Sequence, residues 1–290
     1  MISYTVWSEA GGIGKTTVSV SLAAAHARND QSVLVIDMDP QDGGLTHHLG
    51  TEDHRKDPEV DNLVRHLVER PKGDFANLTQ QVEDNIDIIP SHNMLSDLEQ
   101  NLNRAAKMEE SMHDANFRWP KEKQLRRVLA DADIPNEYDV IIVDPPATVG
   151  QHLYNAVYAT SNLVIPAELS PKGKQSVDGL RDVVDGIEEK LGDIEIGVLG
   201  VVPNKVSDTN LQSEYENRLA EQDLPVAPVS IRERGSMLGE AWENQVSIFQ
   251  LAENDEYRDL RDYEEQTLDK FDQLAKYITE QFEQPTEAPA

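Results

Sequence analysis

The chain has 290 residues, of which 54 are acidic and 26 are Lys or Arg, and it contains no cysteine. Disulfides, thiolate zinc sites, cysteine nucleophiles and cysteine-bound iron–sulfur clusters are therefore excluded. No run approaches 18 consecutive apolar residues and no basic leader precedes the first apolar segment, so we expect a cytoplasmic protein without a membrane span or signal peptide. We expect one domain over residues 1–283 and a disordered tail over 284–290.

The formal net charge is −28, and the acidic residues are spread along the chain. Such a charge destabilises a compact fold at low salt through self-repulsion, whereas at molar salt the Debye length falls to about 3 Å. The composition therefore favours a halophilic source, in which acidity reflects the solvent. An acidic surface that binds a basic partner is the alternative interpretation.

A glycine-rich loop near the N-terminus lies between two predicted elements. The alternation of Ile2, Tyr4 and Val6 predicts a buried strand, and a helix is predicted over Thr16 to Arg28. A strand, a glycine loop and a helix N-terminus together form the setting of a phosphate-binding loop. In that loop the backbone N–H groups face phosphate oxygens, the lysine reaches the β- and γ-phosphates and the threonine hydroxyl meets Mg²⁺. The candidate residues are Gly11, Gly12, Ile13, Gly14, Lys15, Thr16 and Thr17.

The loop departs from the ordinary pattern G-x-x-x-x-G-K-[ST], because Glu9 stands where the first glycine belongs. It resembles more closely the deviant phosphate loop K-G-G-x-G-K-[ST]-T of the ParA/MinD partition and positioning ATPases. In that family a signature lysine precedes the two glycines, and here Ala10 occupies its position. A glycine-rich turn with a chance lysine is the alternative.

A second buried strand, predicted over Val33–Ile36, delivers the sequence Asp37-Met38-Asp39-Pro40-Gln41 to the carboxyl edge of the sheet. This segment resembles the D-x-D-P-Q motif of the same family. The resemblance implies that Asp39 orients or deprotonates the attacking water. The alternative is that Asp39 caps the turn before Pro40.

A third predicted strand ends in an acidic residue. Four apolar residues, Val140 to Val143, precede Asp144, Pro145 and Pro146. This is typical of a Walker B strand, whose carboxylate holds Mg²⁺ through water. The family's usual form is D-x-P-P, so the loop in this chain is one residue shorter.

Two further segments resemble the part of the family site that surrounds the base. A strand predicted over Ile196–Val202 leads to Asn204, at the position of the asparagine that contacts the adenine edge. The segment from Ile231 and Arg232 resembles the I-P-R-x loop beside the base, with Arg232 in place of proline. An ordinary asparagine in a turn is the alternative for Asn204.

The predicted elements alternate between strands and helices, which indicates a doubly wound, mainly parallel α/β sheet with helices on both faces, as in P-loop NTPases. We expect the histidines to be solvated loop residues, since they lack metal-ligand spacing. Further strands are predicted at 86–90 and 163–166. Further helices are predicted at 60–69, 96–112, 120–130 and 256–282, and another follows Lys174 and ends near Leu191. The histidines expected in loops are His47, His48, His92 and His113.

The resemblance implies an ATPase that binds ATP or ADP with Mg²⁺ and dimerises around two nucleotides. It further implies a ParB-like or cargo-adaptor partner and association with the nucleoid. Because the net charge repels phosphate, DNA binding would require a local basic patch, for which the candidates are Arg218, Arg232, Arg234, Arg258 and Arg261.

Two other classes of function remain open at this stage. A MinD-like protein would anchor to a membrane through a basic C-terminal helix, but residues 256–283 hold nine acidic and four basic side chains. An ATP-bound switch with little hydrolysis is favoured by Ala10, since alanine cannot supply the signature charge. Lys172 and Lys174 lie in a loop that we expect at the nucleotide edge, and they are the candidate surrogates for that lysine. The alternative, which the sequence favours, is that they are chance surface lysines.

Overall fold

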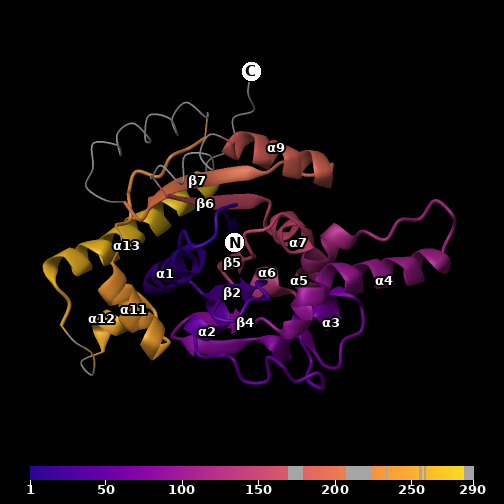
Figure 1. The fold of residues 1–290 in the computed structure, drawn as a ribbon, viewed down its shortest axis with the longest axis horizontal. Coiled ribbons are helices and arrows are strands. Elements are labelled where there is room, and N and C mark those ends of the chain that lie inside the picture. Colours follow the sequence, from indigo (N-terminus) through magenta and orange to yellow (C-terminus); the bar gives the residue numbers. More distant parts are fainter. Residues whose placement is uncertain (169–178, 207–223, 233, 255–256, 258, 284–290) are drawn as a thin grey trace.

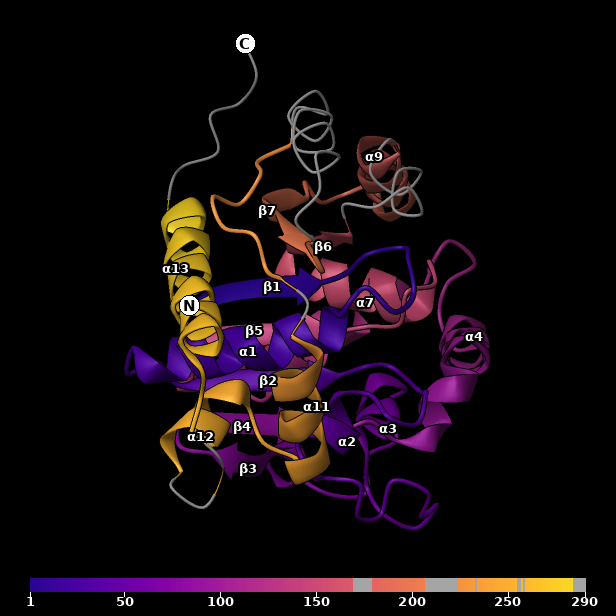
Figure 2. The ribbon, with the colours of Figure 1, turned by 60° about the vertical axis from the view of Figure 1, so that its left-hand side comes forward.

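In a computed structural model of the chain, a seven-stranded sheet runs through the centre of the described part in the order β3-β4-β2-β5-β1-β6-β7. The described residues are 1–168, 179–206, 224–232, 234–254, 257 and 259–283. Adjacent strands are parallel except β3 and β4, which are antiparallel. Figure 2 shows the strands one below another from β7 to β3. The strands are β1 Ile2–Val6, β2 Val33–Asp37, β3 Gln80–Glu83, β4 Ile86–Ile89, β5 Val140–Asp144, β6 Asn162–Glu168 and β7 Gly197–Asn204.

The central strands are buried on both faces, which explains their continuous apolar sequences. In β2, Val33 and Val35 belong to the core on one face, while Leu34 and Ile36 belong to the core on the other. This alternation follows from the period of two along a strand. The sheet therefore has a separate apolar core above and below it.

The helices form a layer on each face of the sheet (Figure 1). One layer includes α1, α11, α12 and α13, with α13 packed along α1 and β7, and the other includes α3, α4, α5, α7 and α9. The α-helices are α1 Lys15–Arg28, α2 Leu45–His48, α3 Leu63–Leu67, α4 Leu98–Ser111, α5 Gln124–Asp131, α6 Ile134–Glu137, α7 Gln151–Thr160, α9 Leu180–Leu191, α11 Gly235–Asn244, α12 Ile248–Glu253 and α13 Asp262–Glu283, and the 3₁₀ helices are η1 Phe75–Leu78, η2 Asn93–Asp97 and η3 Lys121–Lys123.

This architecture confirms the predicted doubly wound fold, but several element boundaries differ. The helix predicted at 60–69 is one short turn, α3, because Asn62 caps its N-terminus by accepting a hydrogen bond from the Arg65 N–H. The last helix begins at Asp262 instead of 256. Sequence analysis missed β3, α7, α11 and α12. The predicted tail at 284–290 lies outside the described residues.

The prediction that the four histidines are solvated is wrong for two of them. His48 and His92 are only 2% and 4% exposed. Their rings are buried because they bond to backbone carbonyls distant in sequence: His48 Nε2 to Val246 O at 3.0 Å, and His92 Nε2 to Asp57 O at 3.0 Å. His47 is partly buried and His113 is exposed.

Candidate functional site

The loop between β1 and α1 has the curled backbone that glycine permits. Gly12 and Gly14 have φ values of 74° and 87°, in the left-handed region that residues with a Cβ rarely adopt. Gly14 is the N-cap of α1 and has no side chain to occupy the space in front of the first free N–H groups. The helix N-terminus is therefore open to an anion at this point.

The end of β7 supports this loop from a distant part of the chain. The Asn204 side-chain amide donates to the Ile13 carbonyl at 2.6 Å, and the Lys205 ammonium donates to the Gly12 carbonyl at 2.7 Å. A Cβ on Gly14 would lie 2.8 Å from Asn204 Nδ2. A side chain at position 14 would therefore displace the Asn204 amide from the phosphate loop, in addition to straining the backbone.

Asp144 lies at the end of β5 and contacts the phosphate-loop helix. The Thr16 hydroxyl donates to Asp144 Oδ2 at 2.8 Å, while Oδ1 has no hydrogen-bond partner among the described residues although it is buried. Burial and the nearby Asp37 carboxylate raise the pKa of Asp144 to about 7, against the opposing effects of Thr16 and Lys15. An unpartnered buried oxygen of this kind calls for a cation or water.

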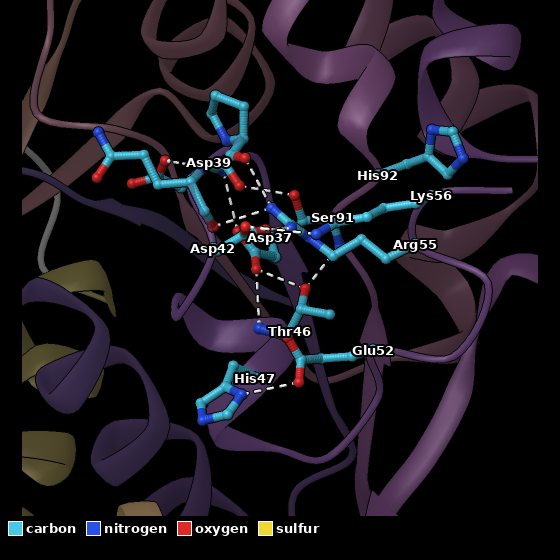
Figure 3. Close-up of polar contacts among 12 residues, drawn as sticks. Asp37, Asp39, Asp42, Thr46, His47, Glu52, Arg55, Lys56, Ser91 and His92 are labelled. Atoms are coloured by element: carbon cyan, nitrogen blue, oxygen red, sulfur yellow. Dashed lines mark hydrogen bonds and ion pairs between the residues drawn. The ribbon is translucent and has the colours of Figure 1, made fainter. Parts of the chain in front are cut away.

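The Asp37 carboxylate lies beside Asp144, because the two residues are register partners on neighbouring strands. Burial raises the pKa of Asp37 to about 6, although the carboxylate accepts hydrogen bonds from Thr46 and from the Asp39 N–H. Figure 3 shows Asp37 at the centre of these contacts, with Asp39 and Thr46 on either side. Asp37 therefore shapes the loop that follows β2.

Asp39 is partly buried and faces the same cavity as the phosphate loop. Its Oδ1 accepts the Gln41 N–H at 2.9 Å, as expected for a residue that caps a turn. The predicted role in orienting water and the alternative role as a turn cap are thus compatible in geometry. A carboxylate oxygen that is not used by the turn can face the cavity.

A cavity of about 430 Å³ brings most of the predicted site together. Its floor is the phosphate loop, one wall is the loop after β2, and the other wall comes from the ends of β7, α11 and α13. Burial lowers the pKa of Lys15, while the Asp144 and Asp39 carboxylates act in the opposite direction. The lining includes Gly11, Gly12, Gly14, Lys15, Thr16, Thr17, Asp39, Asn204, Lys205, Ile231, Arg232, Gly235, Leu238, Trp242 and Phe271.

These residues fit a nucleotide with Mg²⁺. The Thr16 hydroxyl and the free Asp144 oxygen are hard oxygen donors, and Mg²⁺ is commonly held by one or two carboxylates with phosphates and waters. No group of three acidic, histidine or cysteine side chains suited to a metal occurs in the described residues. Thr16 and Asp144 would hold Mg²⁺, which would supply positive charge to neutralise the phosphates.

A protein-family model, AAA_31, described as an AAA domain, matches residues 3–196. The chain belongs to this family. Its relatives place it among the ParA/MinD-type P-loop ATPases: it is 27% identical to the sporulation initiation inhibitor protein Soj of Bacillus subtilis, over 64% of this chain and 66% of Soj. It is 28% identical to the maintenance of carboxysome distribution protein A (McdA) of Synechococcus elongatus, over 70% of this chain and 72% of that protein.

Another relative, an uncharacterized protein from Methanocaldococcus jannaschii, is 29% identical over 79% of this chain and 83% of its own length. The chain is 30% identical to a Mycobacterium tuberculosis protein, over 63% of this chain and 52% of that protein. Among solved structures, apo McdA from Cyanothece superposes with a TM-score of 0.72 and 25% identity, covering 96% of this chain and 99% of that one.

Every predicted nucleotide residue except Ile13 lines the cavity. Ile13 is buried, and its carbonyl is held by Asn204. Asn204 thus has a contact to the phosphate loop that sequence analysis did not foresee, and its predicted role at the adenine edge stays a prediction. Lys172 and Lys174 lie outside the described residues.

Sequence reasoning missed Lys205 and Trp242 as site residues. Lys205 directly follows Asn204 and has a φ of 52°, but its contact with Gly12 depends on the fold. Trp242 comes from α11, which was not predicted, and its ring lies 5.1 Å from that of His47 and 5.0 Å from that of His48. An aromatic residue after a glycine-rich segment carries no distinctive signal in a single sequence.

Proposed function

We propose that the protein is an ATPase that dimerises on binding ATP and uses the cycle to partition or position DNA or another cargo. A ParB-like or cargo-adaptor protein would stimulate hydrolysis, which is slow without it. The printed names of the relatives Soj and McdA support partition or positioning as the class of process. The proposed location is the cytoplasm, on or near the nucleoid.

The observation that carries the ATPase proposal is the position of Asp39. Its carboxylate lines the same cavity as Lys15, and Thr16 in that cavity bonds to Asp144. A phosphate cradle, a metal-binding carboxylate and a second carboxylate for the attacking water are the parts that nucleotide hydrolysis requires. In this assignment Lys15 binds phosphate, Thr16 and Asp144 hold Mg²⁺, and Asp39 positions water.

Two substitutions separate binding from turnover. Asp39→Ala should keep ATP affinity close to that of the wild type and lower hydrolysis about 10²- to 10⁴-fold, the usual contribution of a general base. Lys15→Ala should lose at least about tenfold in ATP affinity, because a charged hydrogen bond of about 1.5–3 kcal/mol is removed. Phosphate release and binding of a fluorescent ATP analogue, both in high KCl with Mg²⁺, measure the two effects.

The same experiment tests the alternative of an ATP-bound switch, which the alanine at position 10 favours. Equal hydrolysis by the wild type and Asp39→Ala would return Asp39 to the role of a turn cap. A wild type that binds ATP but does not hydrolyse it, with or without its partner, would support the switch. Lys172 and Lys174 remain the proposed surrogates for the signature lysine; replacing either by alanine should lower turnover and ATP-dependent dimerisation.

A basic cluster supports the DNA part of the proposal. Burial lowers the pKa of Lys270, and the positive charges of Arg232 and Arg234 lower it further. The Arg234 and Arg261 guanidinium carbons lie 5.0 and 5.8 Å from the Tyr263 ring centroid. The cluster Arg232, Arg234, Arg261 and Lys270 thus concentrates positive charge in an acidic chain. Arg218 and Arg258 lie outside the described residues.

Reversing a charge in this cluster tests DNA binding. Arg261→Glu should reduce ATP-dependent DNA retention and lower the slope of log affinity against log salt by about 1, because one phosphate contact is lost. Lys276→Glu is the control, since Lys276 lies within α13, outside this cluster, and its side chain is 79% exposed. Equal retention by the two variants, or none by the wild type with ATP at any salt that preserves folding, would favour a protein scaffold over DNA.

The MinD-like alternative has little support from α13. The apolar side chains of this helix, Phe271, Leu274 and Ile278, are buried in the core that it shares with α1. A helix anchored in a membrane would need those side chains for the lipid. Among the described helices, none is long and apolar enough to cross a membrane.

A further inference from the structure

The loop that carries Asp39 is held by side chains that do not line the nucleotide cavity (Figure 3). These side chains are Arg55, in the segment after α2, and Ser91, in the segment after β4. Together they donate hydrogen bonds to the carbonyl groups of residues 39, 40 and 41. The backbone that follows the Asp39 side chain is thus fixed from outside the cavity.

Arg55 makes the larger share of these contacts. Its Nη2 donates to the Pro40 carbonyl at 2.6 Å and to the Gln41 carbonyl at 2.9 Å, and its Nη1 pairs with the Asp42 carboxylate. The Arg55 side chain is only 5% exposed, whereas that of Asp42 is 70% exposed. An ion pair with an exposed partner contributes little to stability. The burial of the Arg55 guanidinium is therefore better explained by its hydrogen bonds to the two carbonyls.

Ser91 connects the same loop to the buried carboxylate of Asp37. Its hydroxyl donates to the Asp39 carbonyl at 2.6 Å, and its N–H donates to the Thr46 hydroxyl at 2.7 Å. The Thr46 hydroxyl in turn donates to Asp37 Oδ2 at 2.6 Å. Because Ser91 is only 1% exposed, these bonds lie in a buried chain that ends at the strand preceding Asp39.

The segments that carry the two side chains are also bonded to each other. The Asn93 N–H donates to the Arg55 carbonyl at 3.1 Å, and His92 Nε2 bonds to the Asp57 carbonyl at 3.0 Å. The segments of Arg55 and Ser91 are therefore connected by hydrogen bonds, and displacement of either segment would be transmitted to the carbonyls of residues 39 to 41.

We propose that Arg55 and Ser91 are positioning residues for ATP hydrolysis, because they fix the backbone around Asp39 so that its carboxylate faces the attacking water. The inference rests on the proposed ATPase function. A displacement of about 1 Å in a positioning group can cost about 10²-fold in rate. Neither side chain contacts the cavity, so neither contributes directly to nucleotide affinity.

The test compares Arg55→Lys and Ser91→Ala with Lys56→Ala. Lysine keeps the charge of Arg55 but cannot reach both carbonyls with a planar fork. Lys56 is the matched control, since it is 71% exposed and lies 3.5 Å from the same Asp42 carboxylate without a carbonyl contact. Arg55→Lys should lower kcat about 10- to 100-fold and Ser91→Ala several-fold, with the Kd for an ATP analogue within about threefold of wild type. Lys56→Ala should match wild type.

A double-mutant cycle separates positioning from general stabilisation. In the Asp39→Ala background Arg55→Lys should cause no further loss of the residual rate, because the group that it positions is absent. If Arg55→Lys does not fold, the kcat and Kd of Ser91→Ala decide alone. The inference is overturned if Arg55→Lys and Ser91→Ala both keep the wild-type kcat. It is also overturned if Arg55→Lys lowers the rate as much in the Asp39→Ala background as in the wild type. A wild type that does not hydrolyse ATP overturns the proposed function itself, and the positioning role with it.

Discussion

At the scale of single residues, the site is dominated by two buried carboxylates, and the nearby Lys15 ammonium does not offset the effect of burial on Asp144. Asp37 and Asp144 are buried side by side, and their raised pKa values of about 6 and 7 show that both resist ionisation. Each carboxylate raises the cost of ionising its neighbour, because like charges in a poorly solvated region repel. Binding of a divalent cation would reverse this preference, so metal affinity should rise as the pH increases through 6 to 7.

The raised pKa of Asp144 predicts a pH-dependent effect of Asp144→Asn. The pKa is 3.8 in the unfolded chain and about 7 in the folded chain, so this group's contribution to stability is fully present below pH 3.8 and is lost as the pH rises through 7. Without Mg²⁺, Asp144→Asn should therefore be more stable than wild type at pH 8, by on the order of 4 kcal/mol, and similar to it near pH 4.

Thermal unfolding in EDTA at several pH values measures this difference. Asp114→Asn serves as the control, because Asp114 is exposed. Adding Mg²⁺ and ATP should stabilise the wild type but not Asp144→Asn. If the difference in stability between wild type and Asp144→Asn does not depend on pH, Asp144 is not a buried carboxylate with a raised pKa.

At the scale of elements, the phosphate loop depends on β7 as much as on its own glycines. Asn204 and Lys205 hold two carbonyls of the loop, so the N–H groups on the opposite side of these peptides are free to face the cavity. The loop is thereby prepared for a phosphate before one binds, which reduces the entropy lost on binding.

The close contact with β7 predicts that Gly14→Ala is more harmful than Gly11→Ala. Gly14 combines a φ of 87° with the 2.8 Å approach to Asn204, whereas a Cβ on Gly11 meets no atom within 4 Å. A left-handed residue with a Cβ costs about 1–3 kcal/mol, and the displaced Asn204 amide adds to this cost. Chemical denaturation should show a clear loss of stability for Gly14→Ala and a smaller one for Gly11→Ala. Equal losses would contradict the role of the Asn204 contact.

At the scale of the whole molecule, the net charge of −28 is the dominant feature. We propose that this charge reflects a halophilic source. Self-repulsion between surface carboxylates is screened over about 10 Å at 0.1 M salt and over about 3 Å at 1 M, so added salt should favour the compact state.

The melting temperature should therefore rise by at least several degrees between about 0.1 and 2 M KCl. Differential scanning fluorimetry of the nucleotide-free protein measures this, and an uncharged osmolyte at equal osmolality separates charge screening from general exclusion of the solute. If KCl leaves the melting temperature unchanged or lowers it, the acidic surface has another purpose, for which binding of a basic partner is the alternative.

Much of the fold and the centre of the site follow from the sequence alone. The strands β1, β2, β5, β6 and β7 were predictable because strands buried on both faces are continuously apolar. The phosphate loop, Asp39 and Asp144 were predictable because each directly follows such a strand, and parallel strands deliver their loops to one edge of the sheet. These signals are local, and a single sequence contains them.

Only the tertiary structure decided the contacts that complete the site. Asn204 and Lys205 reach the phosphate loop from about 190 residues away, and Arg55 and Ser91 join the Asp39 loop from separate segments. Likewise, the burial of His48 depends on a carbonyl at Val246 and on the ring of Trp242. None of these residues has a distinctive pattern of neighbours in sequence, because what fixes its role is a hydrogen-bond partner brought close by folding.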